Sequence, residues 1–190
     1  MKKIAICGNI ASGKSLVQSI LQEQGYKVLN TDDVAHELLN VDNTPLFEAF
    51  KNFDVFDNGD FSREKLGRIV FSNDSLLNKL NSILHPQIAN KINEFFHQNS
   101  LERVLFVAIP LLFEANMQSL FDEILFIYAD DELRLKRLME RNGYDLEYAK
   151  KRINSQMQQD EKIKFVDYVI YNNKDFEQLK MSVLDFIKRV

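Results

Sequence analysis

The hydrophobic positions of the chain form short apolar runs that alternate with segments of helical spacing. Each run is rich in β-branched or aromatic residues and is followed by a helical pattern; the runs cover residues 3–7, 26–29, 104–109, 124–128 and 168–171. The first helical pattern, residues 15–24, is closed by Gly25, which is typical of a helix C-terminus. Short strands that alternate with helices predict an α/β fold, with a five-stranded parallel sheet and helices on both of its faces.

Two segments interrupt this alternation. Residues 31–101 contain no convincing strand of the sheet, but they include amphipathic helical patterns at 63–71 and 88–96. Residues 132–164 are dense in Arg and Lys, and Asn142-Gly143 is their evident turn. We therefore expect three parts: a nucleotide-binding core made of residues 1–30, 102–131 and 165–190, a helical substrate-binding domain at 31–101, and a lid at 132–164.

Composition narrows the class of protein. The 190 residues are 45% hydrophobic and 27% charged, as in a soluble globular protein with one compact core and appended segments. A net charge of -4 gives no general attraction for nucleic acid, so an anionic ligand needs a local cluster of basic groups and backbone amides. No apolar run is long enough for a signal peptide or a membrane span, which predicts a cytoplasmic protein without membrane contact.

The few cysteine and histidine residues give no sign of a metal centre. Cys7 is the single cysteine and lies within the first apolar run, where we expect it to pack as a small hydrophobic side chain. His36 and His97 lack partners at the spacing of metal ligands. We expect a monomer, although the sequence leaves an oligomer open.

Residues 8–15, GNIASGKS, match the phosphate-binding pattern G-x-x-x-x-G-K-[ST] between a predicted strand and a predicted helix. In such a loop successive backbone N–H groups surround phosphate oxygens, and the helix N-terminus adds partial positive charge. We expect Lys14 to reach the β- and γ-phosphates and the Ser15 hydroxyl to coordinate Mg²⁺. The expected ATP-binding residues of this segment are Asn9, Ile10, Ala11, Ser12, Gly13, Lys14, Ser15 and Leu16.

Asp32 follows the second predicted strand, as Lys14 follows the first. Because ligands of an open parallel sheet lie beyond the carboxyl ends of its strands, we expect both side chains to face one crevice. There the Asp32 carboxylate would accept the proton of an attacking hydroxyl group. The alternative is that Asp32 or Asp33 only N-caps a helix that begins near Val34.

The third apolar run has no Asp at its end, where many P-loop ATPases carry a carboxylate for Mg²⁺. It continues instead as PLLFE, residues 110–114. Magnesium would then be held by Ser15, the phosphates and water, with Asp32 or Glu114 as candidates for an indirect contact. This arrangement favours a small-molecule kinase over a motor ATPase.

Arg134, Arg137 and Arg141 fall at i, i+3 and i+7 and therefore share one face of a predicted helix. Such a face can close over a triphosphate, neutralise its charge and exclude water, as a kinase lid must. The alternative is a solvated basic face, which is favoured most for Arg134, Lys136, Lys150 and Lys151.

The sequence leaves the roles of two further segments undecided. His85-Pro86 either marks a boundary between two helices or brings His85 to the substrate. After the fifth run, Asn172-Asn173-Lys174-Asp175 misses the guanine-reading spacing N-K-x-D by one residue, so guanine specificity is disfavoured. Asn172 is a candidate for a place beside adenine.

Taken together, these residues resemble the dephospho-CoA kinase family. The resemblance covers nearly the whole chain: the phosphate-binding loop, VLNTDDVA at 28–35, LHP at 84–86, IPLLFE at 109–114, Arg137 with Arg141, Arg152 with Gln156, and residues 167–172. The loop alone would indicate only a P-loop protein. PLLFE after the third strand, with HP before it and R-x-x-x-R after it, is specific to this family.

The resemblance implies a P-loop kinase with a sheet core, a helical domain that binds dephospho-CoA, and an arginine-bearing lid. It implies ATP-dependent phosphorylation of the ribose 3′-hydroxyl of dephospho-CoA, which yields CoA and ADP. The implied catalytic residues are Lys14, Asp32 and Arg141. Further nucleotide contacts are assigned to Arg137, Arg141 and Asn172, and substrate contacts to Asp32, His85, Pro110, Leu111 and Glu114.

The chain departs from the family pattern at several positions. Asn9 and Ala11 stand where the family is richer in glycine, Asn30 where it has Asp, His36 where it has Arg, and Arg134 where it has Gln. Asp32 would therefore act without a companion carboxylate, and a substrate contact at position 36 is in doubt. Two alternatives remain: another small-molecule P-loop kinase, of the nucleoside monophosphate or shikimate type, and a non-catalytic nucleotide switch.

Overall fold

The computed structural model describes residues 1–40 and 42–190. The chain forms two compact units, one made of Met1–Asn30 and Gln98–Val190 and the other of Thr31–His97. The segment expected as a lid, residues 132–164, belongs to the same unit as the sheet. None of the helices in the described ranges combines the length and the apolar character that crossing a membrane requires.

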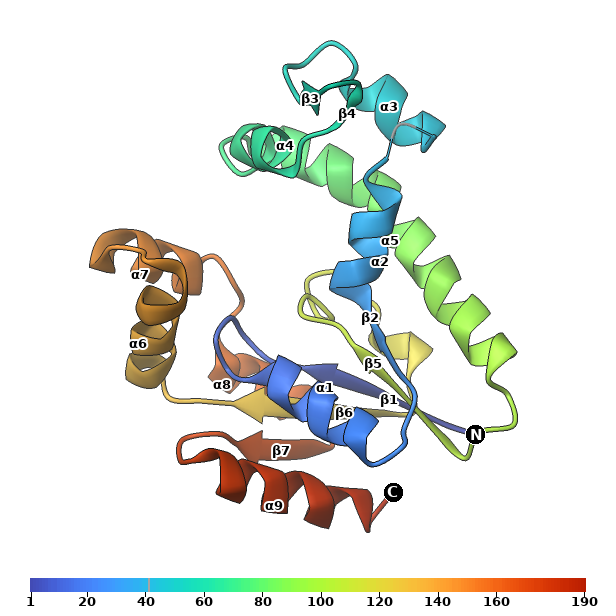
Figure 1. Ribbon diagram of the computed structural model, residues 1–190, viewed down its shortest axis with the longest axis vertical. Helices are drawn as coiled ribbons and strands as arrows, with labels where there is room; N and C mark the ends of the chain where they lie inside the picture. The colour runs from blue at the N-terminus through green and yellow to red at the C-terminus, as the bar shows by residue number, and fades with distance from the viewer. Residues whose placement is uncertain (41) are drawn as a thin grey trace. The chain divides into compact units, whose positions relative to one another are not determined.

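A five-stranded parallel sheet forms the centre of the first unit (Figure 1), which confirms the expected fold class. Its strands are β1 (Lys2–Cys7), β2 (Val28–Asn30), β5 (Val104–Ala108), β6 (Glu123–Tyr128) and β7 (Tyr168–Tyr171). They lie in the order β2-β5-β1-β6-β7, and all their pairings are parallel. The connection that leaves β1 runs toward one edge of the sheet, whereas the connection that leaves β5 crosses to the other side of β1. The loop after β1 therefore lies at the topological switch point, where open α/β sheets bind ligands.

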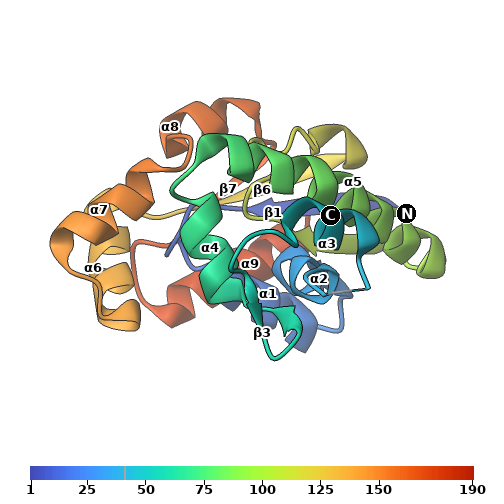
Figure 2. The same ribbon diagram turned by 90° about the horizontal axis from the view of Figure 1, so that it is seen from above.

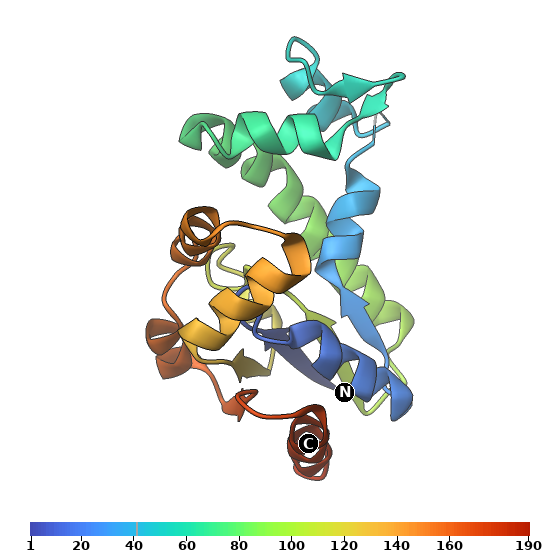
Figure 3. The same cartoon turned by 60° about the vertical axis from the view of Figure 1, so that its left-hand side comes forward.

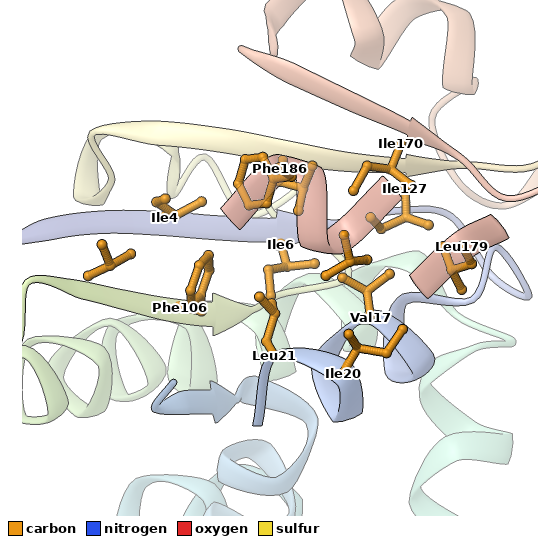
Figure 4. Close-up of a cluster of buried hydrophobic side chains, with 13 residues drawn as sticks. Ile4, Ile6, Val17, Ile20, Leu21, Phe106, Ile127, Ile170, Leu179 and Phe186 are labelled. Atoms are coloured by element: carbon orange, nitrogen blue, oxygen red, sulfur yellow. The ribbon is translucent and has the colours of Figure 1, made fainter. Parts of the chain in front are cut away.

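The main core lies between the sheet and two helices (Figure 4). Alternate strand residues such as Ile4, Ile6 and Phe106 pack on one face against α1 (Lys14–Glu23) and α9 (Phe176–Ile187). The residues between them, among them Ala5 and Leu105, are also buried. Strands that are buried on both faces give continuous apolar runs, and for this reason the sequence pattern located them.

The remaining helices of the first unit follow β6. They are α6 (Asp131–Asn142), α7 (Leu146–Asn154) and α8 (Gln159–Lys162), and two short 3₁₀ helices occur at Gln118–Leu120 and Ile163–Phe165. Seen from above, α8 lies on the side of the sheet opposite to α1 and α9 (Figure 2). Gly143 ends α6 with φ 66°, a left-handed conformation that glycine adopts without strain.

The second unit is mainly helical and has its own core. Its elements are α2 (Thr31–Leu38), α3 (Thr44–Phe50), β3 (Phe56–Asp57), β4 (Asp60–Phe61), α4 (Arg63–Val70) and α5 (Asp74–Gln98), whose last residue belongs to the first unit. The core comprises Leu46, Phe50, Val55, Phe61, Leu66 and Val70. The antiparallel hairpin of β3 and β4 was not predicted, because two-residue strands give no readable alternation.

Two interpretations of local sequence in this unit are wrong. His85-Pro86 does not separate two helices, because Pro86 lies inside the 25-residue helix α5. The buried face of α5, which includes Leu84 and Ile88, continues across the proline, and this packing outweighs its local cost. Neither Asp32 nor Asp33 is an N-cap, because α2 begins at Thr31 and both lie in its first turn.

Candidate active site

The loop between β1 and α1 has the backbone conformation of an anion-binding loop. The Ser12 N–H donates to the Asn9 carbonyl oxygen at 3.0 Å, which closes the turn. Ala11 has φ 61°, and Gly13, the N-cap of α1, has φ 97°. Left-handed residues next to a helix N-terminus are typical of loops whose N–H groups converge on phosphate. Lys14 follows directly as the first residue of α1.

Glycine allows two neighbouring groups to approach this loop closely. A Cβ atom on Gly8 would lie 2.7 Å from the Ile127 carbonyl oxygen, and one on Gly13 would lie 2.1 Å from Nδ2 of Asn172. Asn172 is buried, and its Nδ2 donates to the Ser12 carbonyl oxygen at 2.8 Å. Asn172 therefore supports the loop backbone, whereas its expected place beside adenine stays a prediction.

Ile10 is held on both sides by residues from beyond β6. Its N–H donates to Oε1 of Gln156 at 2.7 Å, and its carbonyl oxygen accepts from Nη1 of Arg134 at 3.4 Å. The side chain of Asn9 is buried, and its Nδ2 donates to the Met157 carbonyl oxygen at 2.9 Å. The segment expected as a lid thus contacts the loop directly.

Arg134 is buried, so the expectation that it is solvated is wrong. It is 1% exposed, and its Nη2 donates to Oδ1 of Asp131 at 2.7 Å. The same oxygen accepts from Nε2 of Gln159 at 2.9 Å. A guanidinium group removed from water needs such partners. The spacing of the arginines defined a helix face, but it did not reveal that this face packs against the loop.

Hydrophobic side chains join the loop to α6 and α7. The ribbon of α6 runs beside the segment between β1 and α1 (Figure 3). Ile10 and Ala11 pack against a cluster whose buried members are Leu138, Ala149 and Ile153. Part of the expected lid is therefore anchored to the loop by apolar contacts as well as by hydrogen bonds.

Arg137 and Arg141 differ in environment although both lie on α6. Burial lowers the pKa of the Arg137 guanidinium, and its Nη1 is buried without a hydrogen-bond partner among the described residues. The group still stays charged at neutral pH. Arg141 is exposed, and its Nε donates to Oδ1 of Asn142 at 2.9 Å. A partly buried cation with an unpaired nitrogen, such as Arg137, is suited to an anionic ligand.

Charged groups also gather near the carboxyl end of β1. Oε1 of Glu114 accepts from Nζ of Lys162 at 2.8 Å and from the Met157 N–H at 3.3 Å, and Lys162 is 1% exposed. Burial raises the pKa of the Cys7 thiol to about 12, and the charges of Lys162, Glu114 and Lys14 act on the same thiol. Glu114 thus binds the buried Lys162, a contact that the sequence did not predict. Pro110 and the exposed Leu111 follow β5 in the same connection.

Two further candidates lie in the second unit. Asp32 is exposed in the first turn of α2, directly after β2. His85 is half-buried in α5, and burial lowers the pKa of its imidazole, so it is neutral at pH 7. Their positions relative to Lys14 stay predictions.

Ser15 offers its hydroxyl oxygen as a ligand for the expected Mg²⁺. Ser15 is exposed in the first turn of α1, so its hydroxyl is an accessible hard oxygen of the kind that Mg²⁺ prefers. Within residues 1–40 and 42–190, no group of three or more His, Cys, Asp or Glu residues could hold a metal ion. A magnesium ion here would rely on Ser15, phosphate oxygens and water.

Sequence reasoning missed the contacts that hold the loop. Gln156 was noted only as part of a family pattern, and Met157 was not noted at all. Met157 acts through its backbone, which leaves no mark on residue type. The side-chain amide of Gln156 gives a signal only when its partner in the folded chain is known.

Comparison with known proteins shows the family to which this chain belongs. The family model described as dephospho-CoA kinase matches residues 2–178. The chain belongs to the dephospho-CoA kinase family. The dephospho-CoA kinase of Listeria innocua is 39% identical over 99% of this chain and 96% of its own length, and that of Carboxydothermus hydrogenoformans is 40% identical over 98% and 93%.

The chain is also similar to solved structures, one of which is a dephospho-CoA kinase. A dephospho-CoA kinase from Campylobacter jejuni has a TM-score of 0.77 at 32% identity, covering 100% of this chain and 97% of that one. The protein TT1252 from Thermus thermophilus has a TM-score of 0.85 at 31% identity, with the same coverage. A shikimate kinase from Bacteroides thetaiotaomicron, which covers 99% of this chain and 97% of its own, shares only the fold, at a TM-score of 0.58 and 12% identity. Members of the family are phosphotransferases that use ATP, and the expectations of a different P-loop kinase or a non-catalytic switch are therefore not supported.

Proposed function

We propose that this protein transfers the γ-phosphoryl group of ATP to the ribose 3′-hydroxyl of dephospho-CoA in the cytoplasm. The observation that carries the proposal is the phosphate-binding loop: its left-handed residues precede Lys14 at the N-terminus of α1, and the nearby α6 offers an unpaired, buried guanidinium nitrogen of Arg137. The family supplies the identity of the acceptor.

The loop and α6 divide the recognition of ATP between them. Backbone N–H groups of the loop bind the phosphate oxygens, except those of Ile10, Ser12 and Leu16, which donate within the protein. Lys14 carries a positive charge to the β- and γ-phosphates. Arg137 gains in the bound phosphate the partner that it lacks among the described residues, and the exposed Arg141 is free to reach the γ-phosphoryl group. Charge that develops during transfer is stabilised by these cations.

Ser15 would hold Mg²⁺ through its hydroxyl oxygen, and the ion would supply positive charge that neutralises the phosphates.

Asp32 acts as the base in this proposal. Its carboxylate takes the proton of the 3′-hydroxyl as that oxygen bonds to the γ-phosphorus. The bond from the γ-phosphorus to the bridging oxygen breaks at the same time, and ADP leaves with the electron pair. His85, Pro110, Leu111 and Glu114 are the proposed acceptor contacts, and the neutral imidazole of His85 suits hydrogen bonding without charge.

One assay tests the proposal. The purified protein is incubated with Mg-ATP and separately with dephospho-CoA, adenylate or shikimate, and each acceptor is weighed by mass spectrometry. We expect dephospho-CoA alone to gain one phosphate, at the 3′-position. Phosphorylation of adenylate or shikimate in its place would refute the proposed acceptor, and ATP binding without any transfer would refute the enzyme activity.

A further inference from the structure

Three hydrogen bonds connect two consecutive loop residues to the segment beyond β6. Gln156 accepts from the Ile10 N–H at 2.7 Å, Arg134 donates to the Ile10 carbonyl oxygen at 3.4 Å, and the Met157 carbonyl oxygen accepts from Asn9 at 2.9 Å. We refer to Arg134, Gln156 and Met157 as the loop clamp. Both peptide groups that flank the Ile10 side chain are thereby fixed.

The loop clamp is itself held in place. Asp131 pairs with Arg134 and also binds the buried Gln159, whose Nε2 donates to the Ala129 carbonyl oxygen at 2.9 Å. The Met157 N–H donates to Glu114, whose carboxylate pairs with the buried Lys162. The residues of the loop clamp are therefore fixed by other residues of the first unit, and they hold Ile10 in a defined position.

A phosphate-binding loop binds well only if its amides are already oriented. The left-handed conformation of Ala11 is rarely adopted by a free chain, because it is strained for a residue that carries a Cβ atom. If the Ile10 peptides could rotate, binding of the triphosphate would have to order them first, and affinity would fall. Groups that fix these peptides in advance therefore favour binding of the nucleotide.

We propose that Gln156 and Arg134 are positioning residues for nucleotide binding, because they hold the peptide groups of Ile10 so that the loop is arranged before ATP arrives. The choice of ATP as ligand rests on the proposed function, whereas the positioning of the loop does not.

Gln156 offers the cleaner test. It is half-buried and lies between α7 and α8, outside the hydrophobic core clusters, so its replacement should not unfold the protein. Gln156→Met keeps the length of the side chain and removes the acceptor oxygen. We expect the Kd for ATP, measured by calorimetric titration, to rise about tenfold, which corresponds to about 1.4 kcal/mol.

The same variant should separate binding from chemistry. At saturating ATP we expect kcat to change by less than about threefold and the KM for dephospho-CoA to stay unchanged, since only the ordering of the loop is affected. Gln158→Met is the matched control, because Gln158 is exposed and its side chain makes no cap hydrogen bond. The control should bind ATP like the wild type.

A double-mutant cycle tests whether both residues act through Ile10. Arg134→Met should also weaken ATP binding, with Lys136→Met as an exposed control on the same helix. If both side chains hold the same residue, the double variant should lose less affinity than the product of the two single losses. Should Arg134→Met fail to fold, Gln156→Met decides the question alone.

An unchanged Kd for ATP in Gln156→Met would overturn the inference. A melting temperature that falls while this Kd stays the same would indicate a structural role only. The effect of Gln156→Met on the Kd for ATP does not depend on which acceptor the protein phosphorylates. A wild-type protein that binds ATP but does not phosphorylate dephospho-CoA would refute the proposed function, and the effect of Gln156→Met on ATP affinity could still be measured.

Discussion

Lys14 is the first residue of α1, and Asp32 lies in the first turn of α2. Lys14 thus begins the helix that follows the loop after β1, and Asp32 lies at the start of the helix that directly follows β2. Helix N-termini stabilise negative charge, which suits the phosphates that Lys14 is proposed to bind. In the proposed reaction, Lys14 acts through its ammonium group and Asp32 through its carboxylate.

We expect Lys14→Ala and Asp32→Asn each to lower kcat/KM by about three orders of magnitude, or about 4 kcal/mol of transition-state stabilisation. Steady-state kinetics with dephospho-CoA measure this loss, and circular dichroism checks that both variants fold. Asp33→Asn is the control, because Asp33 is exposed in the same helical turn. Turnover near the wild-type rate in Asp32→Asn would show that Asp32 is not the base.

Cys7 illustrates how burial sets reactivity. Burial raises the pKa of its thiol from 9.0 to about 12, so the folded protein keeps it protonated at pH 8. We expect a thiolate-specific reagent to label the unfolded chain rapidly and the folded chain very slowly. Labelling at equal rates in both states would mean that the thiol is accessible.

The same shift gives a pH dependence of stability. An acid whose pKa is raised by folding stabilises the fold fully below its unfolded pKa, and this contribution is lost as the pH rises from about 9 toward 12. Relative to Cys7→Ala, the wild type should therefore lose urea resistance between pH 8 and pH 10. An identical loss in both proteins would contradict this cause.

At the scale of elements, α9 shows how a local signal and packing cooperate. Its N-cap Asp175 accepts from the Gln178 N–H at 2.9 Å, and its buried face supplies Leu179, Val183 and Phe186 to the core beneath the sheet (Figure 4). The cap satisfies a backbone donor that the helix itself leaves unpaired.

Asp175→Ala should lower the free energy of unfolding by about 1 kcal/mol because the Gln178 N–H loses its acceptor. Asp175→Asn should retain most of the stability, since asparagine is an equally good cap. Urea denaturation of the three proteins measures the difference. Equal stability of the alanine and asparagine variants would exclude the cap as the cause.

The helix α5 shows the opposite balance between local signal and packing. Proline inside a helix removes a hydrogen bond and crowds the preceding turn, so a boundary at Pro86 was the reasonable local prediction. The helix nevertheless continues to Gln98, because its apolar stripe keeps its period on both sides of Pro86. Burial of a continuous face is worth more than one lost hydrogen bond.

At the scale of the whole molecule, the two units have separate hydrophobic cores. The cluster beneath the sheet draws only on the first unit, and the cluster that contains Phe50 and Leu66 draws only on the second. Separate cores allow one unit to be weakened while the other stays folded. Nucleotide binding is proposed for the first unit, whereas the proposed acceptor contacts include Asp32 and His85 of the second.

Phe50→Ala should therefore separate the two functions. Phe50 is fully buried, and its removal leaves a cavity that costs the second unit about 3 to 5 kcal/mol. We expect transfer to dephospho-CoA to fall sharply while the Kd for ATP changes little, as measured by turnover and by titration. Phe71→Ala is the control, since Phe71 is 71% exposed. A parallel loss of ATP affinity in Phe50→Ala would show that the units fold as one.

The sequence by itself determined the sheet and the loop. Strands such as β1 and β5 are buried on both faces and so read as unbroken apolar runs, and GNIASGKS at 8–15 carries its function in residue type and spacing. These features are local: each is encoded within a few consecutive residues, so no knowledge of distant partners was needed to find them.

Only the tertiary structure decided what surrounds the loop. Arg134 was expected in solvent and is buried, Gln156 holds the Ile10 N–H, and Asn172 supports the Ser12 carbonyl. These contacts join residues that are more than a hundred positions apart, and a polar side chain in a sequence does not indicate its partner. Hydrogen bonds and burial depend on which surfaces meet, and this is settled only when the sheet, α6 and α7 pack together.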